Sequence, residues 1–253
     1  MKTNTLTLEA KNITKSFGQT QVLKGISLHV ARGEMLGILG DNGAGKSTLM
    51  KILSGFQQQT SGDLLVDGKP TRLLSVDHAR SFGIECVYQD LALVNSLSVY
   101  HNMFLNREIK RGWPIPTLNH RAMRERAAAA LDEIGVSVPS MDVEVGTLSG
   151  GQKQAIAIAR AVASNARILL LDEPLAAMGA REAGLIIALI ERLKARGDIS
   201  MIMIAHNYVQ TLDVADRIMM VQRGICTFAG HSANTSVTEL LDIVRREYRE
   251  DAA

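Results

Sequence analysis

The chain has few cysteines and almost no net charge, and both absences narrow its possible functions. The only cysteines among its 253 residues are Cys86 and Cys226, which lack C-x-x-C spacing. We therefore expect neither a disulfide framework nor a zinc site, and we expect both thiols to be buried. The 28 basic and 26 acidic residues leave a formal net charge of +2, which gives no electrostatic reason to expect a nucleic acid partner.

Long apolar runs are also absent. The nearest candidate for a membrane-spanning helix, residues 156–171, is interrupted by Arg160 and Arg167 and falls short of about 18 consecutive apolar residues. Residues 1–10 mix polar with apolar side chains, so they lack the continuous apolar core of a secretory signal. We expect the chain to stay in the cytosol and to reach a membrane only through a partner.

A phosphate-binding loop is the clearest motif present. Residues 40–48 read GDNGAGKST and lie between an apolar run at 35–39 and a helical run at 48–53. In this pattern the glycines let backbone N–H groups point inward, Lys46 reaches the β- and γ-phosphates, and the Ser47 hydroxyl holds Mg²⁺. The strand-loop-helix context disfavours the alternative, a glycine-rich turn that binds nothing. The predicted nucleotide-binding residues are Gly40, Asp41, Asn42, Gly43, Ala44, Gly45, Lys46, Ser47 and Thr48.

Two carboxylates follow a buried strand. Residues 168–171 are apolar and lead directly into Asp172 and Glu173, which places both side chains beyond the carboxyl end of a strand, where open α/β sheets bind ligands. Asp172 is predicted to coordinate Mg²⁺ directly or through water, and Glu173 to act as the general base on an attacking water. The alternative is a strand followed by an acidic helix start, which the phosphate-binding loop in the same chain disfavours.

A serine and two glycines precede the next helical segment and form a second candidate anion site. Ser149, Gly150, Gly151 and Gln152 combine a hydroxyl, backbone N–H groups and a helix dipole. Taken alone, this segment fits an ordinary helix cap better, with Ser149 satisfying the free N–H groups.

Apolar periodicity predicts an α/β fold. Helices are expected at 119–134, 149–163 and 181–196, and a hairpin at 64–68. Strands are expected at 5–11, 22–30, 35–39, 83–88, 168–171, 200–205 and 217–222. Strands separated by helices predict a parallel sheet covered on both faces. Between 90 and 146 the pattern changes to polar loops and one helix, which indicates a helical insertion.

The phosphate loop, LSGGQ at 148–152 and LLLDEP at 169–174, in this order, resemble the ATP-binding subunit of an ABC transporter over nearly the whole chain. The resemblance implies a P-loop NTPase cassette in which a mixed sheet carries an antiparallel β subdomain and a helical subdomain. It implies one domain over 1–253, with a RecA-like core at about 1–89 and 165–230, a helical subdomain at about 90–164 and a C-terminal helix at about 235–250. In that family two cassettes face head to tail, so Ser149, Gly151 and Gln152 are expected to act in trans.

Further residues match the family one at a time. Gln89, after the strand at 83–88, resembles the glutamine that senses the γ-phosphate and Mg²⁺ beside the membrane-subunit contact. His206, after the strand at 200–205, resembles the switch histidine on the γ-phosphate, and Phe17 resembles the aromatic that stacks on adenine. The resemblance thus implies a catalytic set of Glu173, His206, Gln89 and Lys46. It implies Mg²⁺ ligands at Ser47, Gln89 and Asp172.

One position departs from the family pattern. Where most members have Ser-Ala-Leu-Asp after the Asp-Glu-Pro triplet, residues 176–179 read AAMG. Gly179 replaces the aspartate that communicates between the two sites, so cross-site coupling stays an open question. Together with residues 88–93 and 205–207, this glycine resembles the importers of simple sugars of the ribose, xylose and fructose kind, and the likeness implies sugar import.

One phosphate loop and one LSGGQ imply that two composite ATP sites require two chains. The implied assembly is a homodimer under two membrane permease subunits, on the cytoplasmic face of the inner membrane, with a separate solute-binding protein. Residues 91–107 follow Gln89 and are expected to form the groove for a permease helix, or else simply to cover the sheet. Two other functions stay open: a soluble ATPase of the same fold, and an ATP-dependent scaffold that does not hydrolyse.

Overall fold

The computed structural model describes residues 6–250, so the start of the first expected strand, at Thr5, lies outside the described residues. An antiparallel sheet with the strand order β2-β1-β4-β5 forms one layer. Its strands are β1 (Leu6–Phe17), β2 (Thr20–Ala31), β4 (Ser61–Val66) and β5 (Lys69–Pro70). The predicted hairpin joins β4 to β5, and its two turn residues, Asp67 and Gly68, both have positive φ, as a two-residue type I′ turn requires.

A larger sheet carries the centre of the fold, with the order β12-β11-β3-β10-β9-β6. Its strands are β3 (Met35–Leu39), β6 (Ile84–Val87), β9 (Ile168–Asp172), β10 (Ser200–Ile204), β11 (Arg217–Gln222) and β12 (Ile225–His231). All neighbouring pairs run parallel except β11 with β12. The predicted parallel sheet is therefore confirmed, and β12 adds an antiparallel edge that the sequence analysis did not include.

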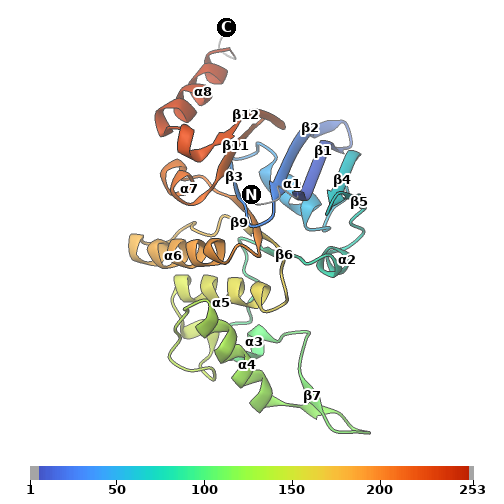
Figure 1. The fold of residues 1–253 in the computed structure, drawn as a ribbon, viewed down its shortest axis with the longest axis vertical. Coiled ribbons are helices and arrows are strands. Elements are labelled where there is room, and N and C mark those ends of the chain that lie inside the picture. Colours follow the sequence, from blue (N-terminus) through green and yellow to red (C-terminus); the bar gives the residue numbers. More distant parts are fainter. Residues whose placement is uncertain (1–5, 251–253) are drawn as a thin grey trace.

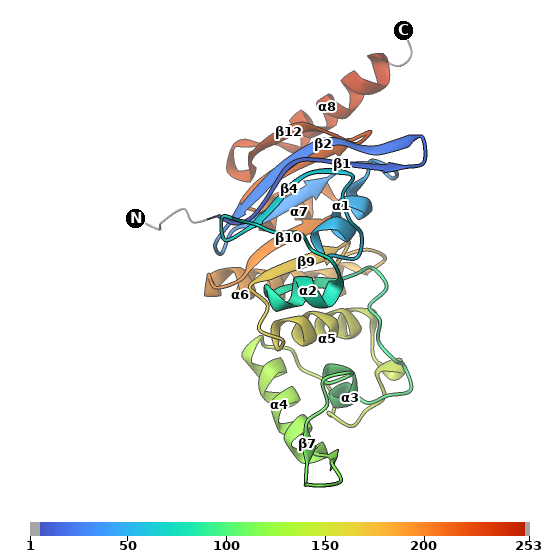
Figure 2. The same cartoon turned by 90° about the vertical axis from the view of Figure 1, so that its right-hand side faces the viewer.

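Helices cover the larger sheet and extend beyond it (Figures 1 and 2). The helices of the sheet layer and of the carboxyl-terminal part are α1 (Lys46–Leu53), α2 (Val76–Ser81), α5 (Gly150–Val162), α6 (Ala180–Arg196), α7 (Tyr208–Val214) and α8 (Val237–Glu250). At the far end lie α3 (Val99–Met103), α4 (His120–Glu133) and a small hairpin of β7 (Lys110–Arg111) and β8 (Thr117–Leu118). Short 3-10 helices occur at Val145–Thr147 and Ser232–Asn234.

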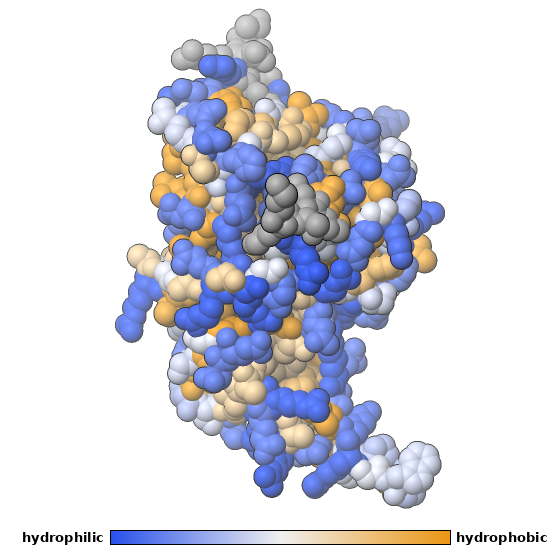
Figure 3. Space-filling view, viewed as in Figure 1, coloured by the Kyte–Doolittle hydropathy of each residue, from blue (hydrophilic) through white to orange (hydrophobic). Residues whose placement is uncertain are grey.

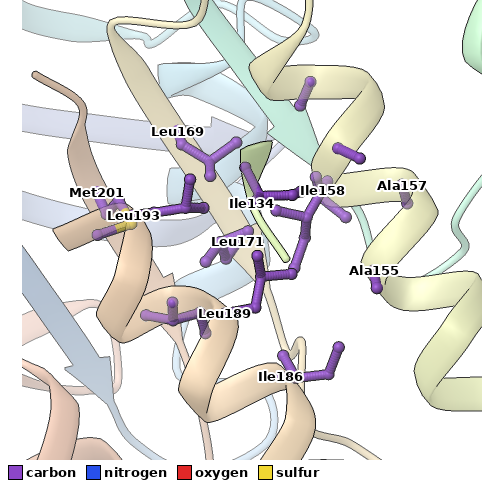
Figure 4. Packing of buried hydrophobic residues seen from close by; sticks show 14 of the residues in the cluster. Ile134, Ala155, Ala157, Ile158, Leu169, Leu171, Ile186, Leu189, Leu193 and Met201 are labelled. Carbon is purple, nitrogen blue, oxygen red and sulfur yellow. The ribbon is translucent and has the colours of Figure 1, made fainter. Parts of the chain in front are cut away.

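Two apolar clusters lie on opposite faces of the larger sheet, because successive side chains of a strand point to opposite faces. Leu169 and Leu171 of β9 pack on one face against Ile158 of α5 and against Leu189 and Leu193 of α6 (Figure 4). The alternate residues of β9 join the second cluster, which includes β1, β2 and α1. A strand that is buried on both faces needs a continuous apolar sequence, which is why β9 was readily predicted.

The cysteines correct one expectation. Cys86 of β6 is half-buried, whereas Cys226 is exposed on the edge strand β12, so the expectation of a buried thiol is wrong for Cys226. Burial raises the pKa of the Cys86 thiol far above its ordinary value, which keeps it protonated and unreactive. Within residues 6–250, no helix combines the length and the apolar character needed to cross a membrane.

Candidate functional site

The phosphate-binding loop connects the end of β3 to the start of α1, and two of its glycines are required by their surroundings. Gly40 has φ +149°, and a Cβ atom there would lie 2.0 Å from the Val221 carbonyl oxygen of β11. Gly45 has φ +104°, and its Cβ would lie 2.7 Å from Leu23 of β2. Side chains at these positions would push the loop off β2 and β11, so the loop conformation depends on both glycines.

Lys46 points back into the loop from the first turn of α1. Its ammonium group is buried and donates to the carbonyl oxygens of Gly40 at 2.7 Å and Asp41 at 2.8 Å. Burial lowers the pKa of Lys46, and the carboxylates of Glu173, Asp41 and Asp172 act in the opposite direction. The loop thus encloses one positive charge beside backbone N–H groups, an arrangement suited to a bound polyphosphate.

Asp172 ends β9 with an unsatisfied oxygen. Its Oδ1 atom is buried and accepts no hydrogen bond in the protein, and burial followed by the neighbouring Glu173 raises the pKa of its carboxyl group. A buried carboxylate oxygen without a partner calls for a cation or an ordered water. Asp172, Ser47 and Gln89 carry carboxylate, hydroxyl and amide oxygens, which are the ligand types that Mg²⁺ prefers, so the chemistry of these residues fits a magnesium ion beside the orphaned Asp172 oxygen.

Glu173 and His206 meet across the ends of two neighbouring strands. His206 Nε2 lies 2.5 Å from Glu173 Oε1, and the Glu173 backbone N–H donates to the Ile204 carbonyl of β10 at 3.0 Å. Glu173 has φ +53°, a conformation that is uncommon for a residue with a side chain and is often found at functional sites. The strand β9 lies between β10 and β6 and runs parallel to both. Gln89, which follows β6, therefore lies at the same carboxyl-terminal end of the sheet as Glu173 and His206.

The LSGGQ segment forms a complete helix cap. Ser149 Oγ accepts the Gln152 backbone N–H, and Gln152 Oε1 accepts the Ser149 backbone N–H, which together make a capping box at the start of α5. The Gly151 N–H donates to Glu182 Oε1 of α6 at 3.4 Å. The motif therefore packs against α6, whereas the phosphate loop packs against β2 and β11, and the chain does not merge the two motifs into one site.

Phe17 ends β1 with its ring nearly half exposed, at 47%. The Lys15 ammonium lies 5.0 Å from the ring centroid, a cation–π distance. An exposed ring is free to stack on a planar ligand, and the exposure shows that Phe17 is not a core residue. Among the other predicted residues, Asp41, Asn42, Gly43, Ser47 and Gln89 are exposed, whereas Thr48 is half-buried and Ala44 is buried.

Residues of the segment 91–107, expected to form a groove, line a cavity between the larger sheet and the helical end, but the sequence analysis missed the charged residues that complete it, Arg80, Glu85 and Arg160. Glu85 of β6 is buried and accepts from Arg107 at 2.7 Å, and Arg80 lies 3.5 Å from it. Arg160 of α5 donates to the carbonyl oxygens of Leu91 and Ala92. These side chains line a cavity of about 230 Å³. The sequence did contain a signal for this cluster. A carboxylate inside a short apolar strand, such as Glu85 in β6, needs a partner of opposite charge.

The orphaned oxygen of Asp172 leads to a stability prediction. We expect Asp172→Asn to stabilise the ligand-free protein by about 1 kcal/mol and to raise Tm by about 2–4 °C. The substitution removes a partly buried charge that burial and Glu173 disfavour, and one oxygen of that carboxylate has no hydrogen-bond partner. Since burial raises the pKa of Asp172, the wild-type protein loses stability as the pH rises through that pKa. The gain should therefore be present at neutral pH and vanish below the ordinary aspartate pKa. Thermal unfolding at both pH values measures it.

Asp63→Asn is the matched control for this change. Asp63 is exposed on β4, so the same substitution there should alter the free energy of unfolding by less than about 0.5 kcal/mol. A lower Tm for Asp172→Asn at neutral pH would mean that Asp172 has a stabilising partner in the ligand-free protein.

Comparison with known proteins identifies the family of this site. The family described as "ABC transporter" matches residues 23–176. A xylose/arabinose import ATP-binding protein of Sulfolobus acidocaldarius is 42% identical over 94% of this chain and 93% of its own length. A fructose import ATP-binding protein of Rhizobium meliloti is 39% identical over 86% of this chain and 85% of its own length.

A ribose import ATP-binding protein of Corynebacterium glutamicum is 40% identical over 86% of this chain, which spans only 40% of that relative's length. Among solved structures, an ATP-binding cassette of an ABC transporter in its ADP conformation matches with a TM-score of 0.82 and 25% identity over 94% of this chain and 98% of its own. A dimeric cassette bound to ADP and phosphate matches with a TM-score of 0.74 and 27% identity over 89% of this chain and 98% of its own. The resemblance and the fold class that the motifs predict are confirmed.

Proposed function

Because this chain belongs to the ABC transporter family of ATP-binding cassettes, we propose that it is the ATP-hydrolysing subunit of a membrane importer for a simple sugar. One observation supports ATP hydrolysis. Lys46, Asp172 and the Glu173–His206 pair lie together at the carboxyl-terminal end of the parallel strands. Relatives named for the import of xylose and arabinose, fructose and ribose support the sugar class.

The chemistry is the in-line attack of water on the γ-phosphate of ATP. Lys46 and the backbone N–H groups of the loop bind the phosphates, and Phe17 stacks on the adenine. Glu173 accepts the proton of the attacking water, and its contact with His206 orients the carboxylate. Ser47, Asp172 and Gln89 would hold Mg²⁺, which would supply positive charge to neutralise the phosphates. His206 donates to the γ-phosphate and so reports its presence.

Two copies of the chain complete the site. The Ser149 hydroxyl, the N–H groups of Gly150 and Gly151, and the Gln152 side chain of one copy bind the triphosphate held by the loop of the other. Dimeric cassettes among the structural relatives support this arrangement. Gly179, the N-cap residue of α6, has open space around its Cβ position and carries no capping side chain, so the sites of the two copies lack the usual aspartate between them.

Different parts of the cassette bind the nucleotide and contact the permease. The core at about 1–89 and 165–230 holds the nucleotide, and the helical subdomain at about 90–164 turns when two copies close on ATP. The groove around Glu85, Arg107 and Arg160 receives a cytoplasmic helix of the permease subunit, which keeps the cassette at the inner face of the cell membrane without spanning it. A separate solute-binding protein delivers the sugar to the permease.

ATP hydrolysis with and without the membrane subunits tests the proposal. We expect the permease in proteoliposomes to raise the hydrolysis rate of the purified chain, and ATP to drive uptake of labelled pentoses or fructose. Fast hydrolysis that the permease does not change would indicate a soluble ATPase instead. Nucleotide binding without hydrolysis under both conditions would indicate an ATP-dependent scaffold.

A further inference from the structure

The hairpin of β7 and β8 exposes an unusual concentration of apolar surface. Trp113 is 94% exposed and Ile115 is 79% exposed, and both lie in the loop between the two strands. Trp113 is the only tryptophan of the chain. Trp113 and Ile115 gather on one short loop, and exposed apolar side chains that form a patch indicate a contact site.

The hairpin has regular structure that holds this loop away from the helices. Lys110 pairs with Leu118 and Arg111 with Thr117 in a sheet of two strands, and the Asn119 N–H donates to the Ile109 carbonyl at 2.7 Å to close the base. Pro114 and Pro116 restrict the backbone on either side of Ile115. Figure 3 shows the loop as a knob that stands clear of the body at the lower right. The aromatic ring is therefore displayed on an ordered support.

The charge of the hairpin strands is basic, and one carboxylate, Glu108, precedes them. Lys110 and Arg111 are exposed beside the loop, and no acidic residue occurs between 109 and 121. Tryptophan partitions to the boundary between lipid headgroups and acyl chains, because one part of its ring system is apolar and its N–H is polar. Basic side chains near it are attracted to anionic headgroups. The combination is complementary to an anionic lipid surface, because Lys110, Arg111 and Arg121 outnumber the single carboxylate of Glu108.

The hairpin and helix α2, which lines the groove, extend toward the same side of the molecule. Arg107 lines that groove, and the chain enters β7 shortly after it. In Figure 1 both α2, which supplies Arg80 to the groove, and β7 extend toward the right, and in Figure 2 both face the viewer. A permease helix that docks on this side of the cassette brings Trp113 to the membrane side. This step rests on the proposed function.

We propose that residues 110–118 form a lipid contact, in which Trp113 and Ile115 enter the headgroup region of an anionic bilayer while Lys110 and Arg111 bind its phosphates. The contact adds a second attachment beside the permease and sets the tilt of the helical subdomain relative to the membrane. Because two copies are paired in the assembly, two hairpins act together and increase the attachment.

The single tryptophan makes the test direct. Emission of the full-length wild-type protein is recorded while vesicles of phosphatidylglycerol or of phosphatidylcholine are added, without permease. We expect a blue shift and quenching by brominated acyl chains with the anionic vesicles only. Lys110→Glu with Arg111→Glu should reduce partitioning by at least roughly thirtyfold, since each basic residue that is lost near an anionic surface contributes about fivefold and each added carboxylate is repelled. The control pair, Lys11→Glu with Lys69→Glu on the antiparallel sheet, changes the charge equally and should bind as the wild type does.

Three outcomes would overturn the proposal. Emission that does not change with anionic vesicles would exclude the lipid contact. A shift that appears only when permease is present in the vesicles would assign the hairpin to the membrane protein, and a shift that grows with protein concentration without lipid would assign it to a second copy. ATP hydrolysis stimulated by the permease is measured on the same samples. Loss of the lipid signal with retained stimulation would reject this inference alone and leave the proposed function intact.

Discussion

Glu173→Gln is expected to bind ATP normally and to hydrolyse it at least about 100-fold more slowly than the wild type. The amide keeps the shape of the carboxylate but cannot accept a proton from the attacking water. Glu173 also adds negative charge beside Asp172. Removing this charge should reduce its repulsion of the γ-phosphate and stabilise the dimer of two ATP-bound copies. Phosphate release measures the rate, and size-exclusion chromatography with light scattering in Mg²⁺ and ATP should give twice the mass of one chain.

Glu191→Gln provides the matched control, because Glu191 lies exposed on α6, the helix that follows this segment. That variant should hydrolyse ATP at the wild-type rate and remain a single chain when ATP is consumed. Turnover of Glu173→Gln close to that of the wild type would remove Glu173 from the role of general base. A slow variant that stays a single chain in ATP would contradict the shared site between two copies.

Lys46→Ala is expected to lose nucleotide affinity by roughly 30-fold to several thousand-fold, the range of 2–5 kcal/mol found when one partner of a buried charge pair is truncated. Lys46 is a buried ammonium that the loop itself surrounds through the carbonyl groups of Gly40 and Asp41. Burial lowers the pKa of Lys46, and the negative charge of bound phosphates acts in the opposite direction. Phosphate binding therefore stabilises the charged ammonium group. Titration with a fluorescent ATP analogue measures the affinity.

Thermal unfolding separates this effect from a loss of structure. Without nucleotide, Lys46→Ala should stay folded, because α1 remains anchored by Leu49, Ile52 and Leu53, all of them buried in the core. Added ATP should raise the Tm of the wild type but not that of the variant. Lys69→Ala, an exposed lysine on β5, should respond to ATP as the wild type does. Unchanged affinity in Lys46→Ala would place the triphosphate away from this loop.

Local patterns predicted the long elements well, and the exceptions have physical reasons. The helix expected at 181–196 is present as α6, and the expected strand at 35–39 is present as β3. Short elements such as α2, α3 and α7 were missed, because fewer than two or three turns leave little periodicity to detect. β12 was missed since its residues are mostly exposed or half-buried on an edge, so its sequence lacks the apolar alternation of an inner strand.

Contacts between distant residues were beyond reach of pattern analysis. His206 contacts Glu173 at a sequence separation of 33 residues, and Arg107 contacts Glu85 at a separation of 22 residues. Gly151 and Glu182 are 31 residues apart in sequence. Each contact depends on which strands and helices become neighbours, and apolar spacing along the chain carries no information about that order. The resemblance to a known family implied roles for Glu173 and His206, but their mutual contact follows only from β9 and β10 lying side by side.

The sequence by itself determined the chemistry of the phosphate loop, the paired carboxylates after an apolar strand and the order of the main strands and helices, because glycine geometry and hydrophobic periodicity act over a few neighbouring residues. Only the tertiary structure decided that the Asp172 oxygen is buried without a partner, that Glu85 and Arg107 line one groove, and that Trp113 stands exposed on a basic hairpin. Burial and exposure are properties of the packed molecule, since each depends on surfaces contributed by segments far apart in the chain.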